Sequence, residues 1–551
     1  MPQTDLILLH TPSIYDFDKL PLVHAPQSEK EASRHLAITS IDFLIITNQL
    51  EQVDYHVRFI DLPYRMARSK RFDTNSFIRK LDAPIFAIEM NDIVQGTGAL
   101  EVAQLIKKHH PDTRTILYGC AAVRFFKELI TRPEVDFVMR GNFDGTSAVQ
   151  LLKSIAAGKF GQVSNLVWKD QRGRVRRNEL SVELVSTRIN ITEYYMCVIR
   201  QLLSYRDFDS ASLLKRWLRH PAISIYTAEP VSSLPTAFRE PEDVYHDIVE
   251  MCCFSSAPVS LKGDIRIPGK HYAERLLSLL QHKPVANSLL FELSDAAPDF
   301  FIQEIARAAP GFWLNIVPGS HDEILRRNLG YTFSNNDLES TIEAALRARA
   351  GRMEVAFMVG LPGQTTASVI HTTAYCEYLL RRFDGDRRLS LSINSCLLPT
   401  DFPVFGRPES YGFIPRFHTF DEYLKSFGLP GWNDRLEYQT TEMSAEQIAK
   451  TTYDALMRLV RLKAKYGQLP CKTVEDMVAN YARGREMVNR LHEIITSGRM
   501  DEQASLQAEV DSINAYNAEP RRQVVLPLML ARPQNLLAMW KALVNNRLQQ
   551  Q

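Results

Sequence analysis

Short apolar runs alternate with amphipathic stretches over the first part of the chain. A parallel strand covered on both faces is apolar throughout, so these runs indicate buried strands. Between them, Ala99–Lys108 places Val102, Leu105 and Ile106 on one helical face. The alternation predicts an α/β domain over residues 1–160, with a doubly wound, Rossmann-like sheet. Its strands are expected at Leu6–His10, His56–Asp61, Ile85–Ile88, Thr115–Tyr118 and Phe137–Met139.

Residues 161–221 predict a hairpin followed by a linker. Val163–Lys169 forms one arm, and the second arm starts at Val175, after a turn that contains Gly173. The arginines around this turn fit a solvated sheet edge, since basic residues discourage pairing with another strand.

A second alternating series over residues 222–400 predicts a partial (β/α)6, TIM-like barrel. Ligands of such barrels bind at the carboxyl ends of the strands. Ser334 and Asp337 are expected to form a capping box at the start of one helix. The strands are expected at Ile223–Tyr226, Val259–Lys262, Ser288–Leu293, Phe312–Ile316, Glu354–Val359 and Leu389–Cys396. The helices are expected at Glu242–Cys253, Tyr272–Leu280, Asp299–Ala308, Leu338–Ala350 and Ala367–Arg381.

Residues 401–551 form a mainly helical region by the same criterion. Ser444 and Gln447 are expected to make a capping box before a long amphipathic stretch. Helices with an apolar stripe more often cover a core or a partner than perform chemistry. They are predicted at Ile448–Tyr466, Val474–Arg485, Met487–Ile495, Leu506–Tyr516 and Gln534–Arg547.

Composition narrows the class of protein. The 551 residues carry 65 basic and 64 acidic side chains. The formal net charge of +1 therefore gives no general attraction to nucleic acid or to an anionic membrane. No apolar run approaches the roughly 20 residues of a membrane helix, and the amino terminus lacks the features of a signal peptide. The seven cysteines are scattered and odd in number, as in a reducing compartment. A cytoplasmic protein is expected.

Several segments together match the motifs of one known family. Val135–Gly141 is similar to the family's fifth strand and its Arg-Gly turn, although Asn142, Phe143 and Asp144 replace the residues usual there. Pro318–Leu325 resembles a barrel strand segment, and Met358–Thr365 is close to a Gly-Leu-Pro-Gly-Glu-Thr motif. Together these segments resemble the cobalamin-binding radical SAM superfamily over about residues 5–400. The resemblance implies a small-molecule or natural-product substrate, or an enzyme, as the partner.

The resemblance implies two ligand sites. Cobalamin is expected at the carboxyl edge of the first sheet, and S-adenosylmethionine (SAM) in the mouth of the barrel. An empty remnant of the cobalamin pocket is the alternative. The implied cobalamin positions are Ser13, Met90, Asn91, Gly119, Cys120, Ala121, Gly141 and Asn142. The implied SAM positions are Asp264, Glu292 and Asn315, with Ser294 and Asn394 nearby.

One departure from the family concerns its iron–sulfur cluster. The family carries Cys-x-x-x-Cys-x-x-Cys in the loop after the first barrel strand, here Ile223–Tyr226. The loop from Glu229 to Pro235 contains no cysteine, and its two matched flanks leave too little room for such a loop. We therefore expect no iron–sulfur cluster and no protein metal ligands, which removes the electron source for radical chemistry.

A histidine motif of other cobalamin proteins has only an incomplete counterpart. Methionine synthase and the mutases use Asp-x-His-x-x-Gly, whose histidine binds cobalt. Asp54-Tyr55-His56 lacks the glycine and enters the second strand, so we interpret it as a coincidence. The resembling family usually lacks this histidine, so its absence does not exclude cobalamin.

Three functions fit these observations. The first is non-radical, cobalamin-dependent transfer of a methyl-type group. The second is a non-catalytic cobalamin sensor, carrier or scaffold that partners a cluster-containing enzyme, and the missing loop and the helical tail favour it. The third, an ordinary radical SAM methyltransferase, would need remote cysteines as cluster ligands. No catalytic residue is assigned from the sequence.

Overall fold

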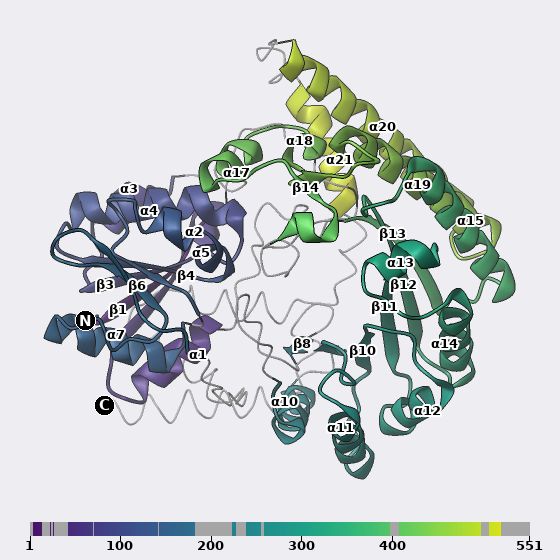
Figure 1. The fold of residues 1–551 in the computed structure, drawn as a ribbon, viewed down its shortest axis with the longest axis horizontal. Coiled ribbons are helices and arrows are strands. Elements are labelled where there is room, and N and C mark those ends of the chain that lie inside the picture. The colour runs from purple at the N-terminus through teal and green to yellow at the C-terminus, as the bar shows by residue number, and fades with distance from the viewer. Residues whose placement is uncertain are drawn as a thin grey trace.

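The computed structural model has two α/β units, followed by a C-terminal helical region that contacts both of them. In Figure 1 the N-terminal unit (purple to blue) and the half barrel (teal) lie on opposite sides, and the C-terminal helices (green to yellow) extend across the top. The structure describes residues 4–13, 23, 26, 42–69, 71–141, 143–181, 223–226, 238–254, 258–396, 407–497 and 506–518.

The N-terminal sheet has five parallel strands in the order β2-β1-β3-β4-β5. Helices cover both of its faces, with α3 and α4 on one side and α1 and α7 on the other (Figure 1). The predicted doubly wound sheet is confirmed. Its strands are β1 (Leu6–His10), β2 (Val57–Asp61), β3 (Ile85–Glu89), β4 (Arg114–Tyr118) and β5 (Phe137–Met139). Its helices are α1 (Asp42–Glu51), α2 (Leu62–Arg68), α3 (Thr74–Ile78), α4 (Gly96–His109), α5 (Cys120–Arg124), α6 (Phe126–Leu129) and α7 (Gly145–Ala157), with a 3-10 turn η2 (Ile93–Gln95).

The predicted hairpin extends this sheet beyond residue 160. Strand β6 (Leu166–Lys169) pairs antiparallel with β5, and β7 (Val175–Arg177) pairs antiparallel with β6. Asp170 in the turn lies 3.1 Å from Arg174 and 2.9 Å from Arg176. These two arginines therefore hold the turn and are not free to form a binding surface.

The second unit is a half barrel of six parallel strands in the order β13-β12-β11-β10-β9-β8. The predicted partial barrel and the Ser334 capping box are confirmed. Its strands are β8 (Ile223–Tyr226), β9 (Val259–Lys262), β10 (Leu289–Leu293), β11 (Trp313–Gly319), β12 (Arg352–Val359) and β13 (Leu389–Ser395). Its helices are α10 (Pro241–Phe254), α11 (Lys270–His282), α12 (Asp299–Ala308), α13 (Glu323–Asn328), α14 (Asn335–Arg347) and α15 (Thr366–Arg382).

The C-terminal region is mainly helical, as predicted, and the Ser444 capping box is present. Its elements are a 3-10 turn η3 (Pro408–Tyr411), β14 (Ile414–Pro415), α17 (Phe420–Phe427), α18 (Trp432–Arg435), β15 (Tyr438–Gln439), α19 (Ala445–Lys465), α20 (Cys471–Thr496) and α21 (Gln507–Ala518). The prediction of two helices on either side of residue 486 was wrong, because α20 is continuous. The predicted helix Gln534–Arg547 and most of the linker before β8 lie outside the described residues.

The C-terminal region contacts both units. On α17, the rings of Phe420 and Tyr423 lie 5.2 and 5.5 Å from Phe125 of the N-terminal unit. The backbone NH of Phe420 also donates to Glu128 over 2.8 Å. Helix α19 packs on α15 and β13 of the half barrel. The C-terminal region therefore bridges the N-terminal unit and the half barrel.

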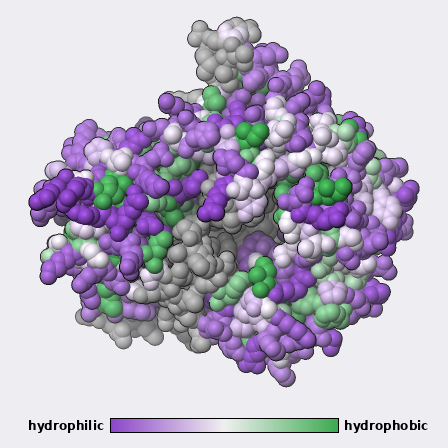
Figure 2. Space-filling view, in the orientation of Figure 1, coloured by the Kyte–Doolittle hydropathy of each residue, from purple (hydrophilic) through white to green (hydrophobic). Residues whose placement is uncertain are grey.

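The coloured residues on the face of the molecule in Figure 2 are predominantly hydrophilic. Exposed large apolar side chains, such as Phe300 and Ile324, lie on separate elements. Among the described helices, none has both the length and the apolar character of a bilayer span.

Candidate functional site

The loops that follow β3 and β4 meet at the carboxyl edge of the N-terminal sheet. The carbonyl of Met90 accepts hydrogen bonds from the backbone NH groups of Ala121 and Ala122, over 3.1 and 3.2 Å. Asn91 and Gly119 lie in the same contact, as the close approach of their atoms shows. The structure thus places four of the residues predicted from the resemblance, Met90, Asn91, Gly119 and Ala121, next to one another.

Gly119 is needed for this contact. It has a φ of +110°, and a Cβ atom there would lie 2.4 Å from Asn91 Oδ1 and 2.7 Å from the Met90 carbonyl oxygen. The resemblance implied Gly119 as a cobalamin position. The structure shows that this glycine allows two loops of the same chain to approach each other.

Gly119→Ala is expected to destabilise the protein by about 1–3 kcal/mol more than Gly269→Ala, because the added methyl group overlaps neighbouring backbone. Gly269 is a matched control: its φ is +122°, and no atom lies within 4 Å of the place that a methyl group would take there. Urea denaturation of both variants measures the difference. Equal losses of stability would show that backbone conformation alone explains the glycine.

The other predicted cobalamin residues lie elsewhere along the same edge. Ser13 is buried in the loop after β1. Gly141 follows β5, where a Cβ atom would lie 2.8 Å from Asn165 Nδ2. Cys120 begins α5 and is partly exposed. Asn142 lies outside the described residues.

A buried histidine and glutamate at this edge were not predicted. His10 and Glu89 end β1 and β3, are register neighbours, and are 0% and 2% exposed. The Nδ1 atom of His10 is hydrogen-bonded to Glu89 Oε2, and Asn91 Nδ2 donates to Glu89 Oε1 over 2.7 Å. No described residue is hydrogen-bonded to the buried His10 Nε2. The only sequence signal was a polar residue at the end of each apolar strand.

Two arginines lie beside the hairpin at the far end of this edge. The guanidinium carbons of Arg140 and Arg177 are 4.9 and 5.2 Å from the centre of the Phe126 ring. Burial, followed by the charge of Arg177, lowers the pKa of Arg140. Arg177 was predicted to be a solvated edge residue, and it remains exposed while contacting this ring.

In the half barrel, a row of polar residues crosses the face opposite the helices. Register pairs Glu292 with Asn315, Asn315 with Glu354, and Glu354 with Ser390 on successive strands. Lys262 of β9 extends the row, since its Nζ lies 2.6 Å from Glu292 Oε1. Adjacent positions along these strands are buried and apolar, so the row lies on the inner face of the barrel.

Two of the predicted SAM residues belong to this row. The second carboxylate oxygen of Glu292 accepts from the backbone NH of Gly263 over 3.0 Å. Asn315 Oδ1 is buried, and none of the described residues donates a hydrogen bond to it.

Asp264, the third predicted SAM residue, is engaged within the chain. Its buried carboxylate accepts from the guanidinium of Arg266, at 2.6 Å to Nη2, and from Ser294 N and Oγ, at 2.8 and 2.9 Å. Burial alone would raise the pKa of Asp264, but Arg266 and the Ser294 NH hold that pKa below its usual value. The carboxylate ties the loops after β9 and β10 together.

Comparison with known proteins identifies the fold. No protein-family model and no curated protein matches the chain. The structure of the radical SAM methyltransferase TsrM from Kitasatospora setae, with cobalamin and a [4Fe-4S] cluster, superimposes with a TM-score of 0.55 and 11% identity. That match covers 90% of this chain and 100% of TsrM. The cobalamin-dependent SAM radical enzyme OxsB, with aqua-cobalamin and SAM bound, gives 0.52 and 10% identity over 99% of this chain and 81% of OxsB.

The fold is that of cobalamin-dependent radical SAM enzymes. A second TsrM structure, with tryptophan and the SAM analogue aza-SAM, gives a TM-score of 0.54 at 12% identity. The resemblance of residues 5–400 therefore extends to the architecture of nearly the whole chain. At these identities the comparison establishes the fold and assigns no chemistry.

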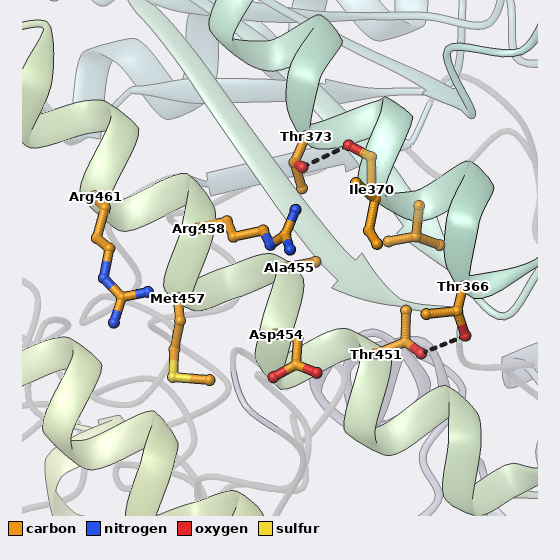
Figure 3. A pocket seen from close by; sticks show the side chains of 10 residues that line it. Thr366, Ile370, Thr373, Thr451, Asp454, Ala455, Met457, Arg458 and Arg461 are labelled. Carbon is orange, nitrogen blue, oxygen red and sulfur yellow. Dashed lines mark hydrogen bonds between the residues drawn. The ribbon is translucent and has the colours of Figure 1, made fainter.

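A surface cleft of about 260 Å³ lies between α15 and α19, apart from both edges described above (Figure 3). Thr366 and Thr451 close one end, with their hydroxyl oxygens 3.2 Å apart, and Arg458 reaches toward Ile370. None of the residues predicted to bind a cofactor lines it. The cleft separates a barrel helix from its covering helix, and we assign it no role in the site.

Proposed function

We propose that this chain binds cobalamin at the carboxyl edge of its N-terminal sheet and takes part in non-radical transfer of a methyl-type group to a small molecule held by the half barrel. The observation that carries the proposal is structural similarity. Both units occur in the same order, over nearly the full length of the chain, in solved structures that hold cobalamin. The residues at the carboxyl edge of the N-terminal sheet are considered for cobalamin, and those on the inner face of the half barrel for SAM or the substrate.

The residues at the N-terminal edge fit cobalamin. The loops after β3 and β4 form a closed floor through Met90, Gly119 and Ala121. The Nε2 atom of His10 supplies a buried nitrogen with no hydrogen-bond partner among the described residues. When bound, cobalamin supplies a cobalt centre that can carry a methyl group from a donor to an acceptor. The chain's own part is to hold and orient that group.

The residues of the half barrel fit a polar small molecule. Lys262, Glu292 and Asn315 present a cation, a carboxylate and a carboxamide side by side on the inner face. SAM or the substrate would contact this row, with Asn315 as the residue whose hydrogen-bonding capacity is open. Asp264 contributes by fixing the loops around the row. The stretch between Cys197 and Cys252 contains no cysteine, so the proposed chemistry uses no cluster.

Anaerobic reconstitution tests this function. The purified chain is incubated with iron, sulfide and hydroxocobalamin, separated from free ligand, and analysed by absorption spectrum and metal content. We expect stoichiometric cobalt and little iron. After chemical reduction of the bound hydroxocobalamin to cob(I)alamin, formation of S-adenosylhomocysteine from added SAM supports transfer chemistry. Stoichiometric iron–sulfur cluster, or no retained cobalamin, would contradict the proposal.

The engaged carboxylates favour a second candidate, a non-catalytic cobalamin carrier or sensor. Asp264 and Glu292 already accept hydrogen bonds from Arg266, Lys262 and backbone groups. A barrel with this arrangement can serve as a scaffold. Retention of cobalamin without any consumption of SAM, in the presence or absence of candidate substrates, would favour this function over transfer.

A further inference from the structure

The His10–Glu89 pair has a defined direction. An ionised carboxylate accepts hydrogen bonds but does not donate them, so with Glu89 ionised the hydrogen between the two side chains lies on His10 Nδ1. Asn91 Nδ2 donates to the other oxygen of Glu89 and fixes the carboxylate in turn. The free lone pair of the imidazole therefore lies on His10 Nε2.

This nitrogen has no stabilising role within the described chain. Burying a polar atom without a hydrogen bond costs about 1–3 kcal/mol, and His10 Nε2 is buried with no described partner. The residues before it, Leu6–Leu9, are all apolar and buried, and the ring packs edge-on against Phe43 at 6.0 Å. The bond to Glu89 accounts for Nδ1 and for the ring orientation, and it leaves Nε2 without a hydrogen-bond partner among the described residues.

The same arrangement occurs in metal centres. A histidine that binds a metal through one ring nitrogen usually donates its other N–H to a carboxylate, which fixes the tautomer and the ring orientation. Among the described residues, no group of three His, Cys, Asp or Glu side chains could hold a bare metal ion. A single imidazole in a fixed orientation therefore suits a metal whose other ligands belong to a cofactor.

The position in the sheet agrees with this interpretation. β1 lies between β2 and β3, so the strand order reverses at β1. Ligands of open α/β sheets bind outside the carboxyl ends at such a reversal. His10 is the last residue of β1 and lies beside Asp61 and Glu89, the last residues of its two neighbours.

The Asp54–His56 segment does not compete for this role. His56 precedes β2, so it lies at the amino edge of the sheet, and its backbone NH donates to Asp5 Oδ2 over 2.7 Å. Its side chain is 54% exposed. The incomplete motif is thus at the opposite edge from the candidate site.

We propose that His10 Nε2 is an axial ligand to the cobalt of cobalamin, and that Glu89 is the residue that positions it. The inference rests on the proposed binding of cobalamin and adds the identity of the protein ligand. Its source is the geometry of the buried pair, not the resemblance, because the resembling family usually lacks a histidine ligand.

Electron paramagnetic resonance of the reduced, cobalt(II) form tests the assignment on the intact protein. The unpaired electron of cobalt(II) couples to an axial nitrogen, so the signal is split into triplets by ¹⁴N and doublets by ¹⁵N. The full chain is produced with ordinary and with ¹⁵N-labelled histidine and loaded with hydroxocobalamin before reduction. We expect the triplets to become doublets on labelling.

Two other results would overturn the assignment. Triplets that persist after labelling would identify the cofactor's own base as the ligand, and a signal without nitrogen splitting would show no axial nitrogen. In both cases retained cobalamin leaves the proposed function standing. Failure to retain cobalamin would remove the proposed function and the ligand together.

Variants identify which histidine is responsible. His10→Gln should abolish the histidine splitting, and Glu89→Gln should weaken cobalamin binding about 10–100-fold. His56→Gln is the matched control and should change neither. Loss of the splitting in His56→Gln instead would contradict the proposal. If His10→Gln fails to fold, labelling of the unaltered chain still shows whether the ligand is a histidine, and weaker binding in Glu89→Gln but not in His56→Gln assigns it to His10.

Discussion

Replacing Arg435 with leucine is expected to lower the free energy of unfolding by about 3 kcal/mol or more and to release the C-terminal region from the N-terminal unit. The guanidinium is buried and donates to the backbone carbonyls of Leu429, Pro430 and Val23, over 2.8, 3.0 and 2.8 Å. Each buried acceptor left without a donor costs about 1–3 kcal/mol. Val23 also donates its NH to the Pro430 carbonyl over 2.8 Å, so the contact spans two distant parts of the chain.

Urea denaturation and limited proteolysis measure this effect. We expect a lower urea midpoint of unfolding and faster proteolytic cleavage of the Arg435→Leu variant than of the wild type. Arg407→Leu is the matched control, because Arg407 belongs to the same region and is exposed. If both variants lose the same stability, the bonds of Arg435 do not hold the region in place.

Asp264→Ala is expected to cost about 3–5 kcal/mol, the usual effect of removing one partner of a buried ion pair. The substitution leaves Arg266 without its carboxylate and Ser294 N without its acceptor. Asp299→Ala is the control: Asp299 and Arg347 are 2.6 Å apart, but both are exposed, so the loss should stay below about 1 kcal/mol. Thermal or urea unfolding of the two variants gives the comparison.

The same carboxylate predicts a dependence on pH. The pKa of Asp264 in the folded protein is below its ordinary value of 3.8. Its ionised form therefore stabilises the fold fully above that ordinary value, and this contribution is lost as the pH falls through the lower, folded-state pKa. The stability difference between the wild type and Asp264→Asn should shrink on acidification over this interval. A difference that stays constant down to the lowest pH would contradict the assigned ion pairing.

The strands were predictable because their environment is uniform. Both faces of a parallel sheet are covered, so each strand reads as an apolar run that ends where the chain leaves the core. Leu6–His10 and Val259–Lys262 were therefore located to the residue. Periodicity also located the helices, but it ended one at Arg485 and began the next at Met487, inside the continuous helix α20. The neighbouring Gly484 does not end the helix either: a Cβ atom there would be 3.0 Å from the Tyr453 hydroxyl, so the glycine allows close packing.

The candidate site was only partly predictable. The resemblance indicated the loops after β3 and β4, and the structure places Met90, Gly119 and Ala121 in contact there. It also indicated Asp264 as a SAM position, and the structure shows that this carboxylate accepts hydrogen bonds from Arg266 and Ser294. Arg266 lies only two positions from Asp264, but Ser294 lies 30 positions away, and local sequence does not show that the loops after β9 and β10 meet.

The sequence by itself determined the two α/β units, their order and the helical region that follows, because burial imposes a periodicity on each element. The tertiary structure decided which polar residues meet. Strand register aligns His10 with Glu89, and Glu292 with Asn315 and Glu354, although these residues are far apart along the chain. Register depends on how whole strands pair and on the turns and helices between them. The polar row in the barrel and the oriented histidine at the sheet edge are therefore properties of the assembled fold.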